Sequence, residues 1–177
     1  MQLGMSVQVS GVVVMKKIFC SLVGVVLMLP NLATFYAAES AGTLSVGASI
    51  VDSCSISAAS LAFGVIDPLG NAGNHVDATA AVLVSCANGT AYHIALDGGG
   101  ATTTTRSMNG ENGTLNYALY SDANRTANWG NNVGIDTVAD TGTGEEQALT
   151  VYGRVPSGQQ NAPAGTYSDT ITVTVTY

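Results

Sequence analysis

Apolar and polar residues alternate one by one in Gly165–Tyr177, the last stretch of the chain. Threonines occupy one side of this stretch, and the other side carries Ile171, Val173, Val175 and Tyr177. A period of two with β-branched residues on both sides predicts a half-buried β-strand, and the chain stops on it without a turn. Because an apolar terminal strand at a sheet edge leaves its backbone N–H and C=O groups unpaired, we predict that it functions by pairing with another chain. The alternative is a strand in mid-sheet, with both neighbours supplied by its own chain.

A second alternating stretch, Ala41–Val51, lies near the start of the chain. Its apolar positions are Leu44, Val46, Ala48 and Ile50. The simplest interpretation is the first strand of the domain. The more specific hypothesis is that this stretch is a strand donated to the groove of another subunit. Cys54 then marks where the chain becomes part of its own domain.

Five further segments have the length and alternation of short strands, and turn residues separate them. They are Ser60–Pro68 (Leu61, Phe63 and Val65 on one face), Thr79–Cys86 (Val82, Val84 and Cys86 inward), Ala91–Asp97 (Tyr92, Ile94 and Leu96 inward), Thr114–Tyr120 (Leu115, Tyr117 and Leu119) and Gln147–Val155 (Leu149, Val151 and Val155). Asn88-Gly89 is a strong signal for a two-residue hairpin between the second and the third. About seven or eight short strands at even spacing predict an all-β, immunoglobulin-like sandwich. The usual Cys…Trp…Cys order is missing, because the only Trp follows both cysteines of the body.

Residues 1–38 have the features of an N-terminal leader. Lys16 and Lys17 precede an apolar run, and small residues follow near Ala37 and Ala38. This arrangement predicts a secretory signal peptide, and the run is shorter than the ~20 apolar residues of a membrane span. Because residues 1–14 carry no charge and precede the signal, we expect translation to start at Met15.

The composition excludes some classes of function. Beyond the leader, three arginines stand against 12 acidic residues, a formal charge of −9. Such a surface repels phosphate backbones, so no nucleic-acid partner is expected. The acidic residues Asp136, Asp140, Glu145 and Glu146 lack the spacing of a calcium loop, so we interpret them as a solvated loop and predict no metal site and no cofactor.

Two cysteines remain once Cys20 leaves with the leader. Cys54 and Cys86 are an even number of cysteines in an exported chain, which predicts one disulfide. No catalytic arrangement accompanies them: His93 points outward from its strand, His75 lies in a loop, and Gly98–Thr105 lacks the lysine and helix of a phosphate-binding loop. We therefore predict that the chain is not an enzyme.

Several tracts, in order, cover nearly the whole chain beyond the leader and are similar to the spore coat protein U family. They are Cys54 followed by LAFGVIDP (Leu61–Pro68), VSC (Val84–Cys86), LNYALYSDANRTANWG (Leu115–Gly130), YGRVP (Tyr152–Pro156) and GTYSDTITVTVTY (Gly165–Tyr177). The resemblance implies a pilin-like domain of the archaic (alternative) chaperone–usher pathway, secreted through the periplasm and built into thin surface fibres for adhesion and biofilm formation. In that pathway the subunit is an incomplete immunoglobulin-like sandwich whose seventh strand is supplied in trans.

The resemblance also implies the partners and the organisation of the chain. A periplasmic chaperone fills the gap first, an outer-membrane usher assembles the fibre, and neighbouring copies or related pilins then replace the chaperone. Residues 39–52 become a donor-strand segment, with Leu44, Val46, Ala48 and Ile50 as its inserted side chains, and residues 53–177 become the domain. Ile171, Val173, Val175 and Tyr177 become the strand that lines the acceptor groove and binds the chaperone.

Two other functions stay open at this point. The chain is alternatively a glycan-binding adhesin domain, in which Trp129, Tyr120 and the Asn-rich loops stack on a sugar. A tip adhesin usually carries an additional domain, for which the chain has no room. The other alternative is a spore-coat surface protein, which the family name suggests and a cleaved signal peptide disfavours.

Overall fold

The computed structural model describes residues 37–71 and 73–177, and the chain divides into two units, Met1–Val46 and Gly47–Tyr177. The predicted signal peptide therefore falls outside the described residues, except for Ala37 and Ala38. Residues 37–53 are exposed and form no strand. The interpretation of Ala41–Val51 as the first strand of its own domain is wrong, since it forms no strand and no strand among the described residues pairs with it.

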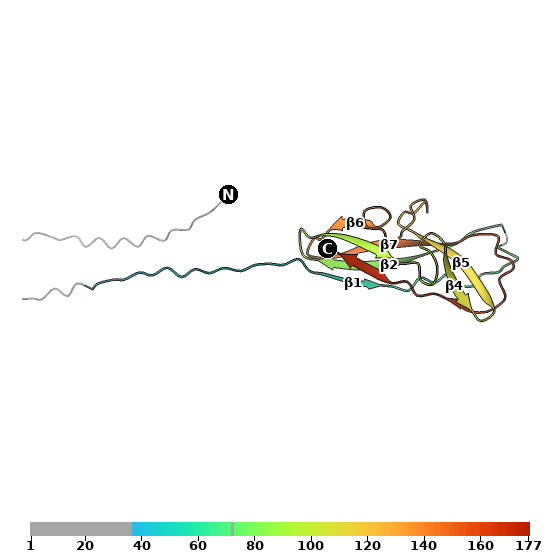
Figure 1. Cartoon of the computed structure of the whole chain (residues 1–177), viewed down its shortest axis with the longest axis horizontal. Helices are drawn as coiled ribbons and strands as arrows, with labels where there is room; N and C mark the ends of the chain where they lie inside the picture. Colours follow the sequence, from blue (N-terminus) through green and yellow to red (C-terminus); the bar gives the residue numbers. More distant parts are fainter. Residues whose placement is uncertain (1–36, 72) are drawn as a thin grey trace, which may run out of the picture. The chain divides into compact units, whose positions relative to one another are not determined.

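The described residues form nine strands and no helix (Figure 1). The strands are β1 (Cys54–Ala58), β2 (Val76–Cys86), β3 (Ala91–Leu96), β4 (Arg106–Gly110), β5 (Gly113–Tyr120), β6 (Val138–Thr141), β7 (Glu146–Val155), β8 (Tyr167–Ser168) and β9 (Val173–Thr176). A larger sheet has the order β1-β2-β7-β5-β4-β8 and a smaller one the order β6-β3-β9. Every pairing is antiparallel. The predicted all-β fold is confirmed.

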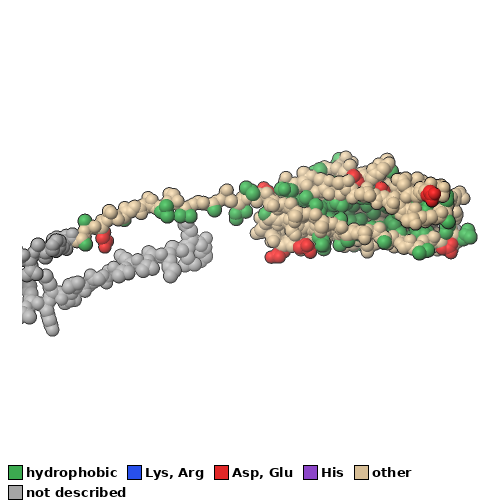
Figure 2. All heavy atoms as spheres, turned by 90° about the horizontal axis from the view of Figure 1, so that it is seen from below, with side chains coloured by type: hydrophobic (Ala, Val, Ile, Leu, Met, Phe, Trp, Pro, Cys, Tyr) green, Lys and Arg blue, Asp and Glu red, His purple; other side chains and the backbone are tan. Residues whose placement is uncertain are grey.

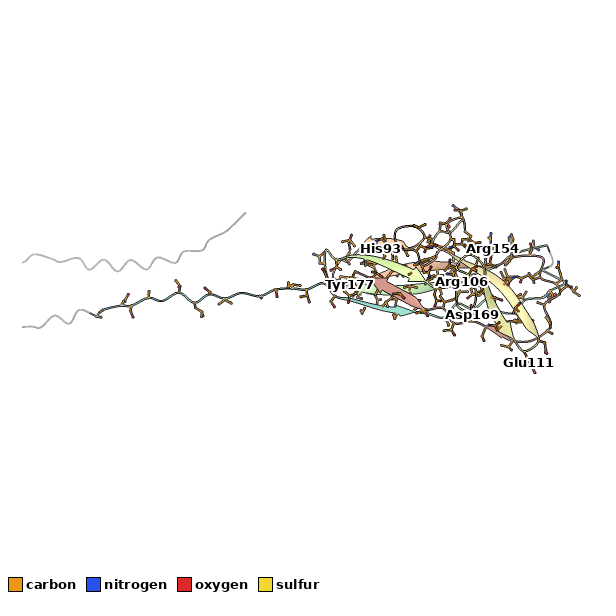
Figure 3. The ribbon with its side chains drawn as sticks, viewed as in Figure 1. His93, Arg106, Glu111, Arg154, Asp169 and Tyr177 are labelled. Atoms are coloured by element: carbon orange, nitrogen blue, oxygen red, sulfur yellow. A yellow bond between two sulfur atoms is a disulfide. The ribbon has the colours of Figure 1, made fainter. Side chains whose placement is uncertain are left out.

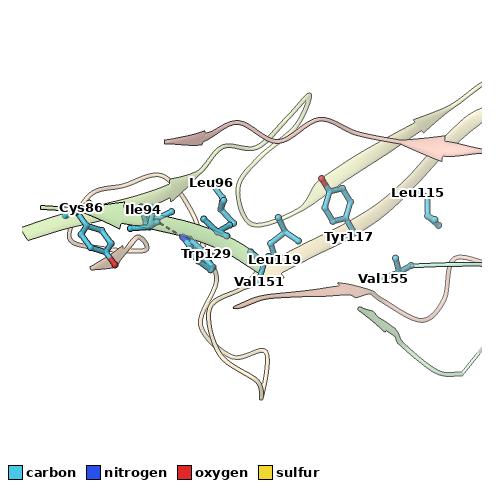
Figure 4. Packing of buried hydrophobic residues seen from close by; sticks show 12 residues of the cluster. Cys86, Ile94, Leu96, Leu115, Tyr117, Leu119, Trp129, Val151 and Val155 are labelled. Carbon is cyan, nitrogen blue, oxygen red and sulfur yellow. Dashed lines mark hydrogen bonds between the residues drawn. The ribbon is translucent and has the colours of Figure 1, made fainter. Parts of the chain in front are cut away.

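The core lies between the two sheets, where alternate residues of each strand meet (Figure 4). The inward residues predicted for β2, β3 and β5 are confirmed, with Val84 and Ile94 fully buried at 0% exposure. Burying each large apolar side chain contributes ~1.5–3 kcal/mol, so these rows are the main source of stability. Val151 and Val155 of β7 are also buried, as predicted, and they form the floor of the groove described below.

The disulfide is confirmed. Cys54 and Cys86 are bonded at an S–S distance of 2.03 Å and lie opposite each other in the β1–β2 ladder. Closing this loop stabilises the fold by roughly 3–4 kcal/mol on the chain-entropy model.

The hairpin predicted at Asn88-Gly89 is wrong. A turn does form there, with Gly89 at a φ of 90° and Thr90 N–H donating to Ala87 O at 3.1 Å. However, β2 pairs with β1 and β7, whereas β3 pairs with β6 and β9. The turn therefore passes the chain from one sheet to the other, and a two-residue turn signal does not distinguish this crossing from a ladder.

The strand predicted at Ser60–Pro68 is also wrong. This segment has no ladder, and Val65 is fully exposed at 100%, while Ile66 packs against the core in its place. Gly64 has a φ of 73°, in the left-handed region, which breaks the alternation and shifts the inward side by one residue. Leu61 and Phe63, before the glycine, face the core as predicted.

The C-terminal stretch Gly165–Tyr177 forms two strands instead of one. β8 pairs with β4 in the larger sheet, whereas β9 pairs with β3 in the smaller sheet. The residues between them carry the chain across the edge of the sandwich. Alternation persists through this crossing, so the sequence pattern did not reveal it.

A groove beside the C-terminal strand

One edge of β9 is unpaired in the described part of the chain. β9 pairs with β3 from His93↔Thr176 to Leu96↔Val173, and no described strand pairs with its other edge. Among the described strands, β1 likewise pairs with β2 alone. Some Cα atoms of β1 and β9 lie within 8 Å of each other, yet the two strands share no ladder. The sandwich is therefore open along the line between β1 and β9.

Two cavities of about 650 and 500 Å³ continue this opening along the domain. Leu61 and Phe63 border both cavities from one wall, and Tyr167 borders both from the other. Figure 2 shows hydrophobic side chains gathered along the middle of the domain on the face drawn. We call the two cavities together the groove. Its apolar lining is contiguous with the core, so the groove is an uncovered part of the core.

The residues predicted to line an acceptor groove lie at different places along it. Ile171 and Val173 line the 500 Å³ cavity, and Val175 is half-buried against the core. Tyr177 is 59% exposed. Two of the four side chains therefore line the groove, Val175 packs against the core outside it, and Tyr177 is largely exposed.

The crossing between β8 and β9 is fixed by polar groups that the sequence analysis missed. The N–H of Asp97 donates to Thr172 O at 3.1 Å, and Thr172 N–H donates to Asp97 Oδ1 at 2.9 Å. Tyr117 Oη–H donates to Asp169 Oδ2 at 2.8 Å. These bonds determine where the chain leaves the larger sheet and where β9 begins.

Arg106 holds the same region from inside the core (Figure 3). Its side chain is fully buried and donates to four backbone carbonyls. They belong to Leu96 (3.1 Å), Asp97 (2.8 Å), Thr103 (2.7 Å) and Trp129 (2.8 Å). Burial lowers the pKa of the guanidinium, although an arginine keeps its proton in proteins. No strand was predicted at Arg106, and alternation gave no signal for this role, although β4 begins at this residue.

Tyr117 and Asp97 both hydrogen-bond to the crossing between β8 and β9, and their pKa values are shifted in opposite directions. Burial, followed by the hydrogen bond to Asp169, raises the pKa of Tyr117 well above its ordinary value. Burial alone would raise the pKa of Asp97, but hydrogen bonds from Thr172 and Gly99 and the charge of Arg106 outweigh it and lower the pKa. Tyr117 is therefore held neutral and Asp97 ionised.

The predicted donor segment is tied to the domain at its C-terminal end. Thr90 Oγ1 donates to Asp52 Oδ1 at 2.6 Å, and Ala87 N–H donates to Ser53 O at 2.9 Å. Before this anchor, Leu44, Val46 and Ile50 are 88%, 87% and 95% exposed. Thr90 lies just before β3, whose start pairs with the end of β9, so the anchor and the end of β9 lie at the same end of the domain.

The sugar-stacking role suggested for Trp129 is wrong. Its ring is only 1% exposed, and its Nε1–H donates to Ile94 O at 2.8 Å inside the core (Figure 4). A buried indole cannot present its face to a sugar. Tyr120, the other aromatic residue of that hypothesis, is half-buried in β5.

Residues of the acidic loop and both histidines have hydrogen-bond partners within the chain. Asp136 Oδ1 accepts from Asn132 N–H at 2.7 Å, and His75 Nδ1 accepts from Ser157 N–H at 3.1 Å. His93 Nδ1 lies 3.2 Å from Thr137 Oγ1. Within residues 37–71 and 73–177, no three His, Cys, Asp or Glu side chains gather as metal ligands, and no helix is long and apolar enough to cross a membrane.

The geometry defines a class of protein: an all-β sandwich of pilin type, closed by one disulfide and open beside its C-terminal strand. A model of the Spore Coat Protein U domain matches residues 40–174, and the chain belongs to this family.

Two known proteins are similar to it over part of their length. Protein U of Myxococcus xanthus is 44% identical over 63 residues, which are 36% of this chain and 34% of that protein. The other is a chain of the crystal structure of the CsuC-CsuE chaperone–tip adhesion subunit pre-assembly complex, from archaic chaperone-usher Csu pili of Acinetobacter baumannii. It matches with a TM-score of 0.50 and 21% identity, over 72% of this chain and 40% of that chain. This chain therefore spans well under half the length of either one, and the structural likeness shows the fold.

Proposed function

We propose that the chain is a structural subunit of a secreted surface pilus, assembled by donor-strand complementation. Residues 39–52 of one copy enter the groove of the next and add a strand to the unpaired edge of β9. The observation that carries this proposal is the coincidence of that edge with an uncovered apolar groove, in a chain that also presents an exposed, alternating segment.

Strand addition explains both features physically. Backbone hydrogen bonds to the edge of β9 bind the incoming strand, and the alternate side chains of that strand fill the cavities. Burying Leu44, Val46 and Ile50 contributes roughly 5–8 kcal/mol, as an upper estimate. Because each copy gives a strand at one place and takes one at another, the contact is head-to-tail and grows filaments.

A periplasmic chaperone and an outer-membrane usher are the partners that this assembly requires. A subunit with an empty groove exposes its core, so another protein must cover it until the next copy arrives. The resemblance to a chain from a chaperone–pilus subunit complex supports the chaperone. Surface localisation, adhesion and biofilm formation follow from the fibre, and the role is structural rather than catalytic.

Deletion of residues 41–51 tests the proposal. The deleted chain keeps its groove, so it should still co-purify with the chaperone but form no fibres by electron microscopy. A matched control is the Thr43→Ala, Ser45→Ala double variant, which changes only the other side of the segment and should form fibres. Fibres made by the deletion variant would overturn the proposal.

The family name and the similarity to Protein U support a second candidate, a component of the spore surface. Immunogold labelling distinguishes the two: label along fibres on vegetative cells supports the pilus, whereas label restricted to a spore coat supports the alternative.

A further inference from the structure

The floor of the groove has a row of small residues between its two cavities. β2 and β7 pair so that Ala80 lies opposite Val151, Ala78 opposite Gly153, and Val76 opposite Val155. The first of these pairs lines the 500 Å³ cavity and the last lines the 650 Å³ cavity. The cavities are therefore four residues apart along β7, which is ~13 Å in a strand.

Gly153 makes room for a partition between the cavities. A Cβ atom at Gly153 would lie 2.9 Å from Leu61 Cδ1 and 2.9 Å from Phe63 Cζ. Leu61 and Phe63 therefore occupy the space that a side chain at position 153 would fill, and each of them lines both cavities. The ring of Phe63 also packs edge-on against Tyr117, with 6.0 Å between the ring centroids. The middle of the groove is therefore already filled by Leu61 and Phe63 of the chain that forms the groove.

The donor-strand segment has a pattern that matches this floor. Val46 and Ile50 are branched, they are four residues apart, and Ala48 lies between them on the same side. In an extended strand their spacing equals the spacing of the two cavities. The small residue of the segment then coincides with the filled middle of the groove.

We propose that Gly153 sets the register of the incoming strand by admitting Leu61 and Phe63 to the groove floor. Ala48 of a second copy lies over the partition that these two side chains form, and Val46 and Ile50 enter the cavities on either side. This inference rests on the proposed function. It makes Gly153 a specificity-determining residue, which selects a strand with a small side chain between two larger ones.

The anchor at Asp52 fixes the direction of insertion. Ile50 lies two residues before Asp52, so it stays close to the body of the donor copy. The 650 Å³ cavity lies at the Val76 end of β2, whereas the acceptor's own anchor lies at the Cys86 end. In a head-to-tail array the donor body adjoins the end opposite the acceptor's anchor. Ile50 therefore fills the 650 Å³ cavity, Val46 fills the 500 Å³ cavity, and the strand runs antiparallel to β9.

The test measures binding of a labelled synthetic peptide of residues 40–51 to the purified full chain by fluorescence anisotropy. The peptide variant Ala48→Leu places a large side chain on the partition and should bind at least about tenfold more weakly, because overpacking a filled site is costly. The size-matched control Ser45→Leu adds the same side chain on the opposite face and should bind within about twofold of the wild type. The chain variant Leu61→Ala removes part of the partition. It should therefore restore much of the affinity that the Ala48→Leu peptide loses.

A second arm acts on Gly153 itself. Gly153→Ala pushes Leu61 and Phe63 into the cavities and should weaken binding of the unmodified peptide, whereas Gly73→Ala, with nothing within 4 Å of its Cβ, should not. If Gly153→Ala prevents folding, the peptide variants still decide the matter, since they use the unmodified chain. Failure of the unmodified peptide to bind would overturn the proposed function. Binding of the Ala48→Leu peptide with unchanged affinity, or a loss that Leu61→Ala does not relieve, would overturn only the register.

Discussion

Asp97 and Thr172 exchange two hydrogen bonds between the end of β3 and the start of β9, one through the backbone N–H of Asp97 and one through its carboxylate. Together they fix the point at which the C-terminal stretch joins the smaller sheet. β9 starts at the next residue, so this pair positions the edge to which a donor strand would add. The same carboxylate oxygen accepts from Gly99 N–H at 3.1 Å, which ties the loop after β3 to this point.

We expect Asp97→Ala to destabilise the fold by about 1–3 kcal/mol, because two backbone N–H groups lose their acceptor. Asp97→Asn retains one acceptor oxygen of the same shape and should cost less. Urea unfolding of both variants measures the difference. Equal stability of the Ala variant and the wild type would show that the bonds accepted by the Asp97 carboxylate do not hold the crossing.

The stability of the chain should fall at both extremes of pH, through different residues. The pKa of Asp97 is lowered in the folded state from an ordinary value of 3.8, so its contribution is present above that value and is lost as the pH falls below it. The pKa of Tyr117 is raised above its ordinary value of 10.0, so its contribution is present below pH 10 and is lost as the pH rises further.

Urea midpoints measured across the pH range check these signs. Asp97→Asn should flatten the acidic limb. Tyr117→Phe should flatten the alkaline limb without abolishing it, because burial also raises the pKa of Tyr92. An alkaline limb unchanged by Tyr117→Phe would show that this phenol is not responsible.

Arg106→Met should destabilise the chain by roughly 3–5 kcal/mol, because it leaves a group of buried carbonyls without a donor. Arg154→Met is the matched control. Arg154 pairs with Asp77 at 2.7 Å near the surface, and loss of such a pair costs at most about 1 kcal/mol. Trp129 fluorescence is the appropriate probe of unfolding, since Arg106 donates directly to the Trp129 carbonyl. Equal losses in the two variants would contradict the role assigned to the buried guanidinium.

The parts of the fold that follow from alternation alone could be predicted from the sequence. Val82, Ile94 and Leu119 face the core because a strand of period two with apolar residues on one side has no other stable arrangement against water. The disulfide followed from counting the cysteines of an exported chain. Features that depend on which sheet a strand joins could not be predicted, since alternation is the same in either sheet. For that reason the crossing between β8 and β9 was missed.

The groove itself depends on contacts between residues far apart in the chain. Gly153 interrupts the row of Leu149, Val151 and Val155 on one face of its strand, and the approach of Leu61 and Phe63 explains why a glycine is there. Trp129 looked like a loop aromatic available to a ligand, whereas the chain folds it into the core. A single sequence carries no signal for either contact.

If the groove accepts a strand, a peptide of residues 40–51 should stabilise the chain by mass action. A ligand that binds only the folded state raises the free energy of unfolding by ~2.7 kcal/mol at a concentration of 100 times its Kd. The stabilisation should therefore grow with peptide concentration in urea or thermal unfolding. The control peptide exchanges Ser45 with Val46 and Ser49 with Ile50, which keeps the composition but moves two apolar side chains to the opposite face. It should stabilise far less, because its serines would meet the apolar lining, at Val151 in the 500 Å³ cavity and at Val155 in the 650 Å³ cavity. Equal stabilisation by both peptides would mean that binding depends on composition alone, and the strand-addition geometry would then be wrong.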